Sequence, residues 1–221
     1  YNLSIYNISF LNSYFETISG FTSTGYTIFE NIKHLDQSLI IWRSTTQWIG
    51  GLYFLFSIIL LIDIFDNNLK KSFTDFLSFD STEILKQSIK VLFLYSILTF
   101  LIFLLFKIIN LRSFDAFNLS LTVISSGGFI PSNNLQTIIN TDFKSIVLSF
   151  TFLISFFSIF FSYNIFFFKR KNLNFFSEDF YLSFYLLILI VIFFIFFNDN
   201  NNFPSVLLAI TSSISNIGIY Y

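Results

Sequence analysis

The chain has 221 residues, a net charge of −1 and only 11% charged residues, whereas 54% of its residues are hydrophobic and 36 are phenylalanine. Charged residues are too few to form the polar surface that a soluble protein of this size needs around its core. The composition therefore indicates a multi-span membrane protein. The many aromatic residues exclude a disordered chain, and the net charge provides no basic field for nucleic acid. The sequence contains no cysteine, which excludes disulfides and thiol chemistry.

Four uncharged runs approach the ~20 residues that a membrane-spanning helix requires. They predict spans at 41–64, 86–108, 144–168 and 179–198. One such run could be a buried helix of a soluble protein, but four in one chain favour a membrane protein.

The distribution of basic residues predicts the orientation of these spans. Because consecutive spans alternate sides, the loops 65–85 and 169–178 share one side, and segments 1–40, 109–143 and 199–221 share the other. Seven of the 12 Lys and Arg residues fall on the first side or at its edge, with the sharpest cluster at 169–171. The positive-inside rule makes this side cytoplasmic. The cluster marks a membrane boundary or, alternatively, a docking site for a gating partner.

The three outer segments contain a repeated patch. It reads FETISGFTSTGYT at 15–27, FNLSLTVISSGGFI at 117–130 and LAITSSISNIGIYY at 208–221. Aligned on Gly25, Gly127 and Gly218, each patch has large apolar residues ten and four positions before the glycine and a small polar residue two positions before it. These anchors are 102 and 91 residues apart, which indicates an internal repeat.

Such a patch suits a half-helix that enters the membrane and stops, because about ten apolar residues are too few to cross it. A glycine lets the chain turn back, and backbone carbonyls can then replace the hydration shell of a cation. The C-terminal end of a half-helix also favours a cation. The alternative is an ordinary outer loop rich in Ser, Thr and Asn, which explains one patch better than three in register.

Several segments resemble Trk-type potassium uptake proteins of the Trk/Ktr/HKT superfamily. Residues 19–27, SGFTSTGYT, resemble the first pore loop, and residues 42–51, WRSTTQWIGG, resemble the WRSLTQWIGG segment that follows it. Residues 125–129, SSGGF, are similar to the second pore loop, and residues 215–218, SNIG, to a divergent third loop.

The resemblance implies an all-α membrane protein built from repeated M1-P-M2 units, each a span, a re-entrant pore helix with its filter loop, and a second span. Four such units surround a pseudo-fourfold, potassium-channel-like pore, of which this chain is expected to be an incomplete part, a fragment without the fourth unit. The implied organisation is a first pore loop and M2 at 1–64, a cytoplasmic loop at 65–85, a complete second repeat at 86–168, a cytoplasmic loop at 169–178, and a third M1 with its pore loop at 179–221.

By the same resemblance, ten residues are expected to form the ion filter. They are Thr22, Ser23, Thr24, Gly25, Ser125, Ser126, Gly127, Asn216, Ile217 and Gly218. No catalytic residue is expected, and the only metal is K⁺, carried as the transported ion without any covalent cofactor. Ile217 places an apolar side chain next to the glycine of the third loop.

The implied function is potassium uptake across the inner, or plasma, membrane by a homodimer that works with a cytoplasmic nucleotide-binding regulatory subunit. A glycine at all three anchors favours potassium, whereas a sodium or other monovalent cation transporter of the same fold and a non-functional gene fragment remain alternatives. The predicted spans contain no His, Cys or central acid, which disfavours a membrane enzyme. Channel-like flux and symport with H⁺ or Na⁺ stay open.

A few further residues have competing interpretations. Glu16 and Asp115 are expected to cap or complement the starts of pore helices, or else to gather cations. Arg43 either anchors a span edge or braces the pore loop, and Gly50–Gly51 form a kink or a close helix contact. His34 and the segment 199–202 are expected to be solvated.

Overall fold

The computed structural model describes residues 8–65, 84–156 and 203–219, together with 181, 184–185, 187–192 and 195. The regular elements in these residues are helices. They are α2 (Phe10–Phe21), η1 (Ile32–His34), α3 (Gln37–Phe65), α5 (Ile84–Ile108), α6 (Ser113–Ile124), η2 (Leu135–Thr137), α7 (Asp142–Phe156) and α10 (Phe203–Ile214). The basic cluster at 169–171, nearly all of both expected cytoplasmic loops and segment 199–202 lie outside the described residues. So does part of the expected span 179–198, although its described positions are helical.

The long helices coincide with the expected spans. α3 covers 41–64, and α5 covers 86–108. At ~1.5 Å per residue, the 25 residues of α5 extend about 37 Å, enough to cross a hydrocarbon core of ~30 Å. Within the described residues, one helix, Ser88–Ile108, is both long and apolar enough to span a membrane. α7 begins near the expected start of its span and is described to Phe156.

α5 ends where its uncharged run ends. Lys107 lies in the last turn, where a positive charge complements the helix dipole, and its Nζ donates to the Leu111 carbonyl at 3.3 Å. Asn110 has a left-handed φ of 58°, and the Leu111 N–H returns to the Phe106 carbonyl. This arrangement terminates α5 and turns the chain into the short helix α6.

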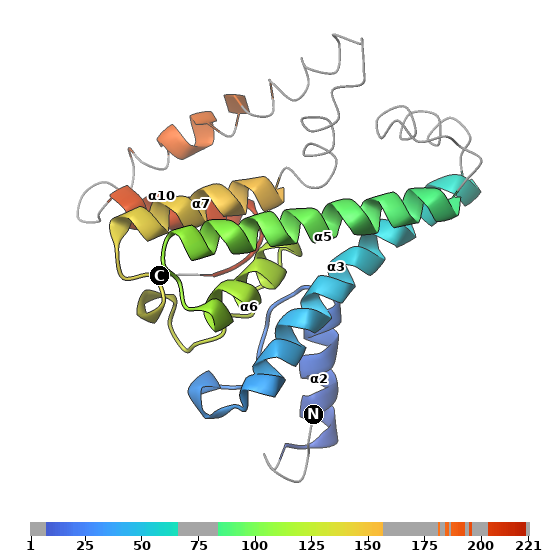
Figure 1. Ribbon diagram of the computed structural model, residues 1–221, viewed down its shortest axis with the longest axis horizontal. Coiled ribbons are helices and arrows are strands. Elements are labelled where there is room, and N and C mark those ends of the chain that lie inside the picture. Colours follow the sequence, from blue (N-terminus) through green and yellow to red (C-terminus); the bar gives the residue numbers. More distant parts are fainter. Residues whose placement is uncertain are drawn as a thin grey trace.

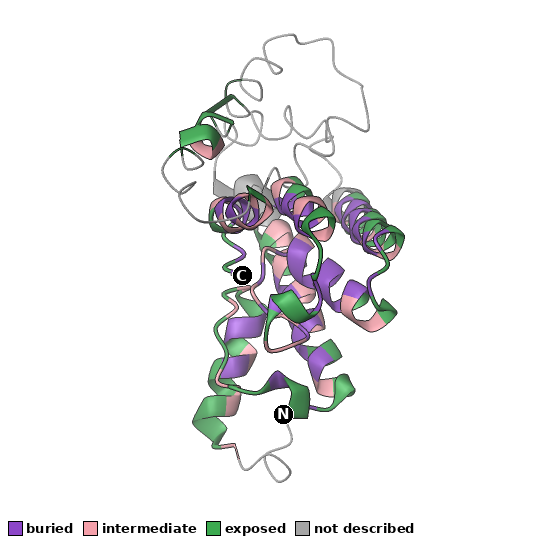
Figure 2. Cartoon of the chain, turned by 90° about the vertical axis from the view of Figure 1, so that its left-hand side faces the viewer, coloured by how far each residue is buried: buried purple, intermediate pink, exposed green. Residues whose placement is uncertain are grey.

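α6 occupies the centre of the described bundle. It packs against α3, α5 and α7, while α10 packs along α7 and α2 packs against α3 (Figure 1). The main apolar core joins α5, α6, α7 and α10 around Phe106 and Phe152, both fully buried. A second cluster joins α3 to α5 around Tyr95. Buried residues therefore follow the faces where these helices meet (Figure 2).

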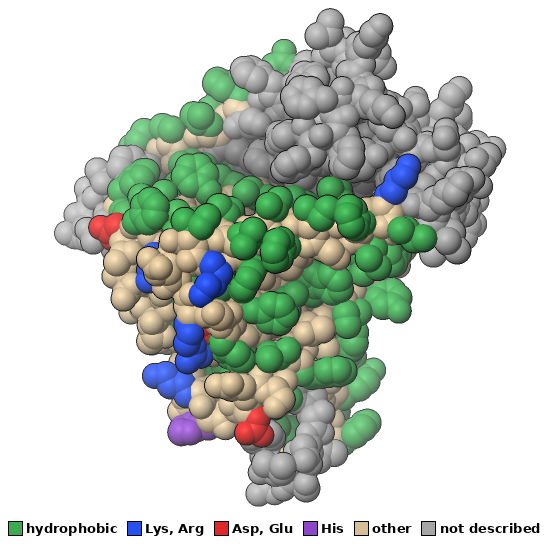
Figure 3. All heavy atoms as spheres, in the orientation of Figure 1, with side chains coloured by type: hydrophobic (Ala, Val, Ile, Leu, Met, Phe, Trp, Pro, Cys, Tyr) green, Lys and Arg blue, Asp and Glu red, His purple; other side chains and the backbone are tan. Residues whose placement is uncertain are grey.

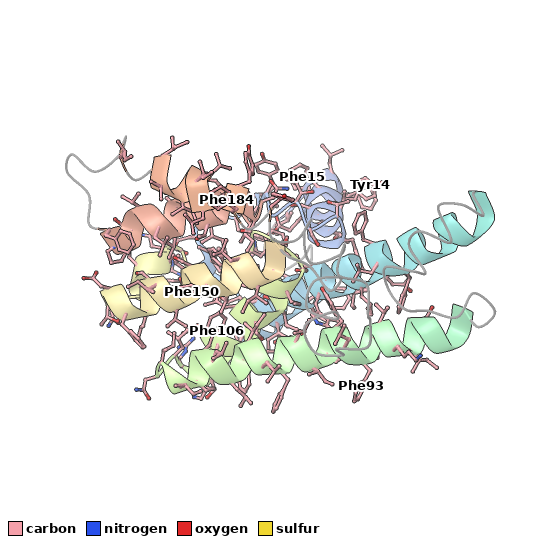
Figure 4. All side chains as sticks on the ribbon, turned by 90° about the horizontal axis from the view of Figure 1, so that it is seen from above. Tyr14, Phe15, Phe93, Phe106, Phe150 and Phe184 are labelled. Atoms are coloured by element: carbon pink, nitrogen blue, oxygen red, sulfur yellow. The ribbon has the colours of Figure 1, made fainter. Side chains whose placement is uncertain are left out.

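The outer face of α5 is apolar. Phe93 is 65% exposed and points away from the bundle, whereas Phe106 on the same helix is 0% exposed (Figure 4). Apolar side chains form a broad band over this face, and basic side chains gather beyond its end (Figure 3). A soluble monomer rarely exposes so large an apolar surface, whereas a bilayer covers it without cost.

The segments that follow α2 and α6 are joined at their outer ends. The side-chain oxygen of Asn133 accepts the N–H groups of Ile32, at 2.6 Å, and Lys33, at 3.2 Å. The Asn133 amide nitrogen also contacts the side chain of Asn31. Beneath this polar clip, a small apolar cluster around Ile32 and Leu35 packs against residues of both segments.

Candidate functional site: three converging helix exits

The helices α2, α6 and α10 end in the same way. Each has 12 residues, and the second residue beyond each helix is left-handed. These residues are Ser23 (φ 52°), Ser126 (φ 52°) and Asn216 (φ 58°). The next residue donates its N–H to a carbonyl five positions back: Thr24 to Ser19 (3.0 Å), Gly127 to Thr122 (2.9 Å) and Ile217 to Ser212 (3.1 Å). This is the Schellman motif, which ends a helix and turns the chain away from its axis.

The shared conformation fixes the register of the three loops. The fourth residue after each helix is Gly25, Gly128 or Gly218. The expected anchor of the second loop, Gly127, is therefore wrong by one position, because its structural equivalents are Thr24 and Ile217. The alignment of the three sequence patches paired Gly127 with Gly25 and Gly218, whereas the backbone conformation pairs Gly128 with them.

The three loops meet through their backbones. A Cβ atom added to Gly25 would lie 2.5 Å from the Gly128 Cα, and one added to Gly128 would lie 2.9 Å from the Ile217 carbonyl oxygen. Neither position has room for a side chain. Gly218 has a positive φ of 68°, as Gly25 does at 79°, but a Cβ atom there would meet no described atom within 4 Å. The third loop thus has an open side.

Most side chains of the expected filter residues bind neighbouring protein atoms. The Thr22 hydroxyl donates to the Ile18 carbonyl of its own helix, and Ser125 donates likewise to Leu121. The Ser126 hydroxyl is 2.9 Å from that of Ser155, and the Ser23 hydroxyl donates to the Gln47 carbonyl. Ile217 is buried in the main core, whereas Asn216 is exposed. Because these side chains support the loops, the backbone carbonyls are the chemical groups suited to a cation.

A row of hydroxyls lies behind the loops. Ser19 donates to the Tyr26 carbonyl and Ser212 to the Ile219 carbonyl, both at 2.6 Å and both seven residues apart. Thr122 is the equivalent residue of α6, but its buried hydroxyl has no hydrogen-bond partner among the described residues. The middle loop therefore lacks one bond that the other two loops make.

A buried ion pair braces the first loop. The Arg43 Nε lies 2.9 Å from Glu16 Oε1, and the two side chains are 1% and 0% exposed. The same carboxylate accepts the Thr27 hydroxyl and the Ile28 N–H, both at 2.9 Å. Arg43 also donates to Thr27 through Nη2, and its guanidinium lies 4.2 Å from the centroid of the Phe129 ring.

This network settles two open interpretations. Glu16 lies in the middle of α2 rather than at its start, so the expected capping role is wrong. The Glu16 carboxylate is also buried and already bonded to Arg43 and to the loop, so it does not gather cations at an outer entrance. Of the two interpretations of Arg43, the structure favours bracing, because its guanidinium is bonded to Thr27 in the loop after α2. Asp115 does lie in the first turn of α6, paired with Arg112, and His34 is exposed in η1, both as expected.

The segment 42–51 of α3 contacts both converging helix ends. A Cβ atom at Gly50 would lie 2.0 Å from the Phe21 carbonyl of α2, and one at Gly51 would lie 3.0 Å from the Ser125 Cβ beyond α6. The glycine pair is therefore a close contact between helices: Gly50 faces the end of α2, and Gly51 faces both Ser125 and the Tyr95 hydroxyl of α5, 2.7 Å from its Cβ position. Gln47 accepts the Phe129 N–H at 3.3 Å, which ties α3 to the second loop.

Sequence reasoning missed two residues of this site, Gly128 and Gln47. The doublet Gly127–Gly128 offered two possible anchors, and the count of residues from the helix end, which distinguishes them, is available only from the structure. Gln47 stands in the segment that resembles the family, one helical turn after Arg43, so its face of α3 was a usable signal. In the described part of the chain no group of three or more His, Cys, Asp or Glu residues forms a metal site.

In the described residues these features define an all-α protein in which 12-residue helices pack against longer ones, one of them long and apolar enough to cross a membrane. The fold is that of the potassium transporter TrkH from Vibrio parahaemolyticus, with a TM-score of 0.68 and 20% sequence identity over 96% of this chain and 46% of that one. No family model matches the chain.

Two curated relatives give the same resemblance in sequence. The chain is 32% identical over 155 residues to an uncharacterized cation transporter of Methanocaldococcus jannaschii, a match that covers 66% of this chain and 31% of that protein. It is 42% identical over 45 residues to the Trk system potassium uptake protein TrkI of Halomonas elongata, covering 20% of this chain and 9% of that protein. The expected resemblance to Trk-type membrane subunits is thus confirmed. The chain spans less than half the length of each of these proteins.

Proposed function

We propose that the chain forms part of a potassium uptake protein and that K⁺ passes where the three helix exits converge. The observation that carries this proposal is the contact between the backbones of Gly25, Gly128 and Ile217. Each of these residues follows a different 12-residue helix that ends in a Schellman turn. The matched relatives are named as cation or potassium transporters, so the chain is a transport protein and not an enzyme.

The chemistry of the proposed filter is carbonyl coordination. A ring of backbone carbonyls can replace the hydration shell of K⁺ and still bind the ion weakly enough to release it. The nearby carboxylate of Glu16 is paired with Arg43, so this acid is not free to bind the ion too tightly. The proposed filter backbone is 22–25, 125–128 and 216–218, which adds Gly128 to the ten residues expected from the sequence. K⁺ is the cargo, and no cofactor is needed.

The proposed architecture assigns a role to each helix. α2 and α3 are the pore helix and M2 of the first repeat within 1–64, and α5, α6 and α7 are M1, pore helix and M2 of the second repeat at 86–168. α10 is the third pore helix within 179–221. The loops 65–85 and 169–178 are cytoplasmic in this proposal. The succession of the 25-residue α5, the 12-residue α6 and the helix α7, described from Asp142 to Phe156, supports it.

The remaining parts of the proposal come from the family resemblance. The protein lies in the inner, or plasma, membrane, works as a homodimer, and is gated by a cytoplasmic nucleotide-binding subunit. Selective transport of Na⁺ by the same loops and loss of function in an incomplete gene product are the alternatives that an experiment must separate.

The test is cation uptake by bacteria that lack their own potassium uptake systems. The complete reading frame that encodes these residues is expressed with and without its cytoplasmic partner, and uptake of K⁺ and of Na⁺ is measured beside growth on low potassium. We expect K⁺-selective uptake, reduced selectivity in Gly25→Ser, and unchanged uptake in the exposed control His34→Gln.

Each other outcome has a definite meaning. If Na⁺ is taken up in preference to K⁺, the transported ion is Na⁺ and the proposed pore still stands. A membrane-inserted protein that transports neither ion, even with its partner present, overturns the proposed function.

A further inference from the structure

Position 127 differs from its equivalents in the other two loops. The first loop has Thr24 there and the third has Ile217, whose side chain is buried in the main core. The second loop has Gly127, which is buried although it has no side chain to bury. The volume beside Gly127 must therefore be filled by another part of the molecule.

The amide group of Gln47 fills that volume. A Cβ atom added to Gly127 would lie 2.4 Å from Gln47 Cδ, 2.4 Å from Oε1 and 2.7 Å from Nε2. Real Cβ atoms essentially never come within 3.0 Å of another heavy atom, so any side chain at 127 would collide with the whole amide. Gln47 itself is 0% exposed and cannot move aside into solvent.

Gln47 is also hydrogen-bonded to both of the loops that meet here. Its Oε1 accepts the N–H of Phe129, the residue after Gly128, at 3.3 Å. Its own backbone carbonyl accepts the Ser23 hydroxyl of the first loop, also at 3.3 Å. One residue of α3 is therefore hydrogen-bonded to residues of two different loops.

We propose that Gln47 is a positioning residue of the second loop. Its side chain reaches from α3 into the space that a side chain at position 127 would occupy, and thereby fixes the backbone conformation of Gly128. This inference rests on the proposed function, because it concerns the geometry of the filter. It adds to that function a specific pair, Gln47 and Gly127, because a side chain at 127 would need the space that the Gln47 amide occupies.

The pair predicts a rescue that few other positions would show. Gly127→Ala alone should lower K⁺ uptake and K⁺ over Na⁺ discrimination, because the new methyl group collides with the amide. Gln47→Ala alone should lower discrimination, because Phe129 loses its acceptor and the loop loses its support. In the double variant the methyl group at 127 gains room, so uptake should recover about tenfold relative to Gly127→Ala, a coupling typical of residues in contact.

Two controls separate positioning from general stability. Gln47→Met fills the space without accepting the Phe129 N–H, so we expect normal insertion with reduced discrimination. Gly51→Ala collides with the Tyr95 hydroxyl and with Ser125 instead of Gln47, so combining it with Gln47→Ala should give no rescue. Discrimination between K⁺ and Na⁺ is the readout that a purely structural role would leave unchanged.

The outcomes also separate this inference from the proposed function. A parent protein that transports K⁺ and a double variant no better than Gly127→Ala overturn the pairing and leave the function intact. If the parent transports no cation, the function fails, and thermal unfolding in detergent still tests the pair. Additive shifts of the unfolding temperature in that experiment overturn the inference.

Discussion

The exit of α2 is held by a buried ion pair, whereas the equivalent exit of α6 is held by packing and by uncharged hydrogen bonds. In the described part of the chain α2 packs against α3, while α6 packs against α3, α5 and α7. The first loop has Glu16, Arg43 and Thr27 bonded to one another. The second has an apolar core around Phe106 and Phe152 and the uncharged hydrogen bonds of Gln47 and Ser126. A buried charge pair can fix a backbone that has few neighbours, whereas a helix surrounded on three sides is held mainly by packing, with weaker polar contacts beside it.

α3 connects these two solutions. Arg43 and Gln47 lie one turn apart on the same face, and each reaches both loops: Arg43 contacts Thr27 and the Phe129 ring, and Gln47 contacts Ser23 and the Phe129 N–H. A disturbance of either loop should therefore be felt by the other through α3.

The largest effect is expected from removing the charge that pairs with Glu16. Arg43→Ala leaves a carboxylate buried without its partner, which should cost about 3 to 5 kcal/mol of stability. Thermal or chemical unfolding in detergent measures this loss.

The control for this change is Arg112→Ala at the start of α6. Arg112 pairs with Asp115 but its side chain is 65% exposed, so its loss should cost less than about 1 kcal/mol. Equal losses in the two variants would contradict the contrast between the loops.

A smaller effect should distinguish two glycines with similar backbones. Gly25→Ala places a methyl group against Gly128 in a left-handed conformation and should cost about 2 to 3 kcal/mol. Gly218→Ala has the same handedness with open space around it, so it should cost about 1 kcal/mol. A larger loss at Gly218 than at Gly25 would show that strain, not contact between loops, dominates at these sites.

The smallest effects concern the row of hydroxyls. Ser212→Ala removes a buried bond to the Ile219 carbonyl and should cost about 1 to 2 kcal/mol. Thr122→Val removes a buried hydroxyl that has no described partner and keeps its shape, so stability should stay the same or rise slightly. Unfolding midpoints of both variants against the parent measure the difference, and a clear loss in Thr122→Val would mean that this hydroxyl is bonded.

The sequence predicted the parts of the structure that repeat or run long. Uncharged runs located α3 and α5 because a helix that crosses a membrane carries few charges over the stretch that lies in the hydrocarbon core. The three patches located the short helices, because half-helices that end in the same turn need the same small residues at the same positions. The resemblance of residues 42–51 to a family segment singled out the part of α3 that contacts both loops.

The rest depended on distances that a sequence does not contain. The anchor of the second loop was misplaced because either glycine of the pair 127–128 satisfies the pattern, and only the neighbours Gln47 and Gly25 tell them apart. Glu16 was expected to serve its own helix end because its partner Arg43 is 27 residues away. Charge pairs between elements cannot be read from local spacing.

The clip formed by Asn133 has a consequence for how the protein is made. It fixes the backbone of Ile32 from a position 101 residues further along the chain. At ~5 to 20 residues per second, the ribosome needs about 5 to 20 s to make that stretch. During this interval the segment at 31–33 has been synthesised but its anchor has not, so its backbone can be fixed by Asn133 only after α3, α5 and α6 have been made. The order of translation therefore separates the completion of this outer segment from that of the first loop, whose partner Arg43 is made much earlier.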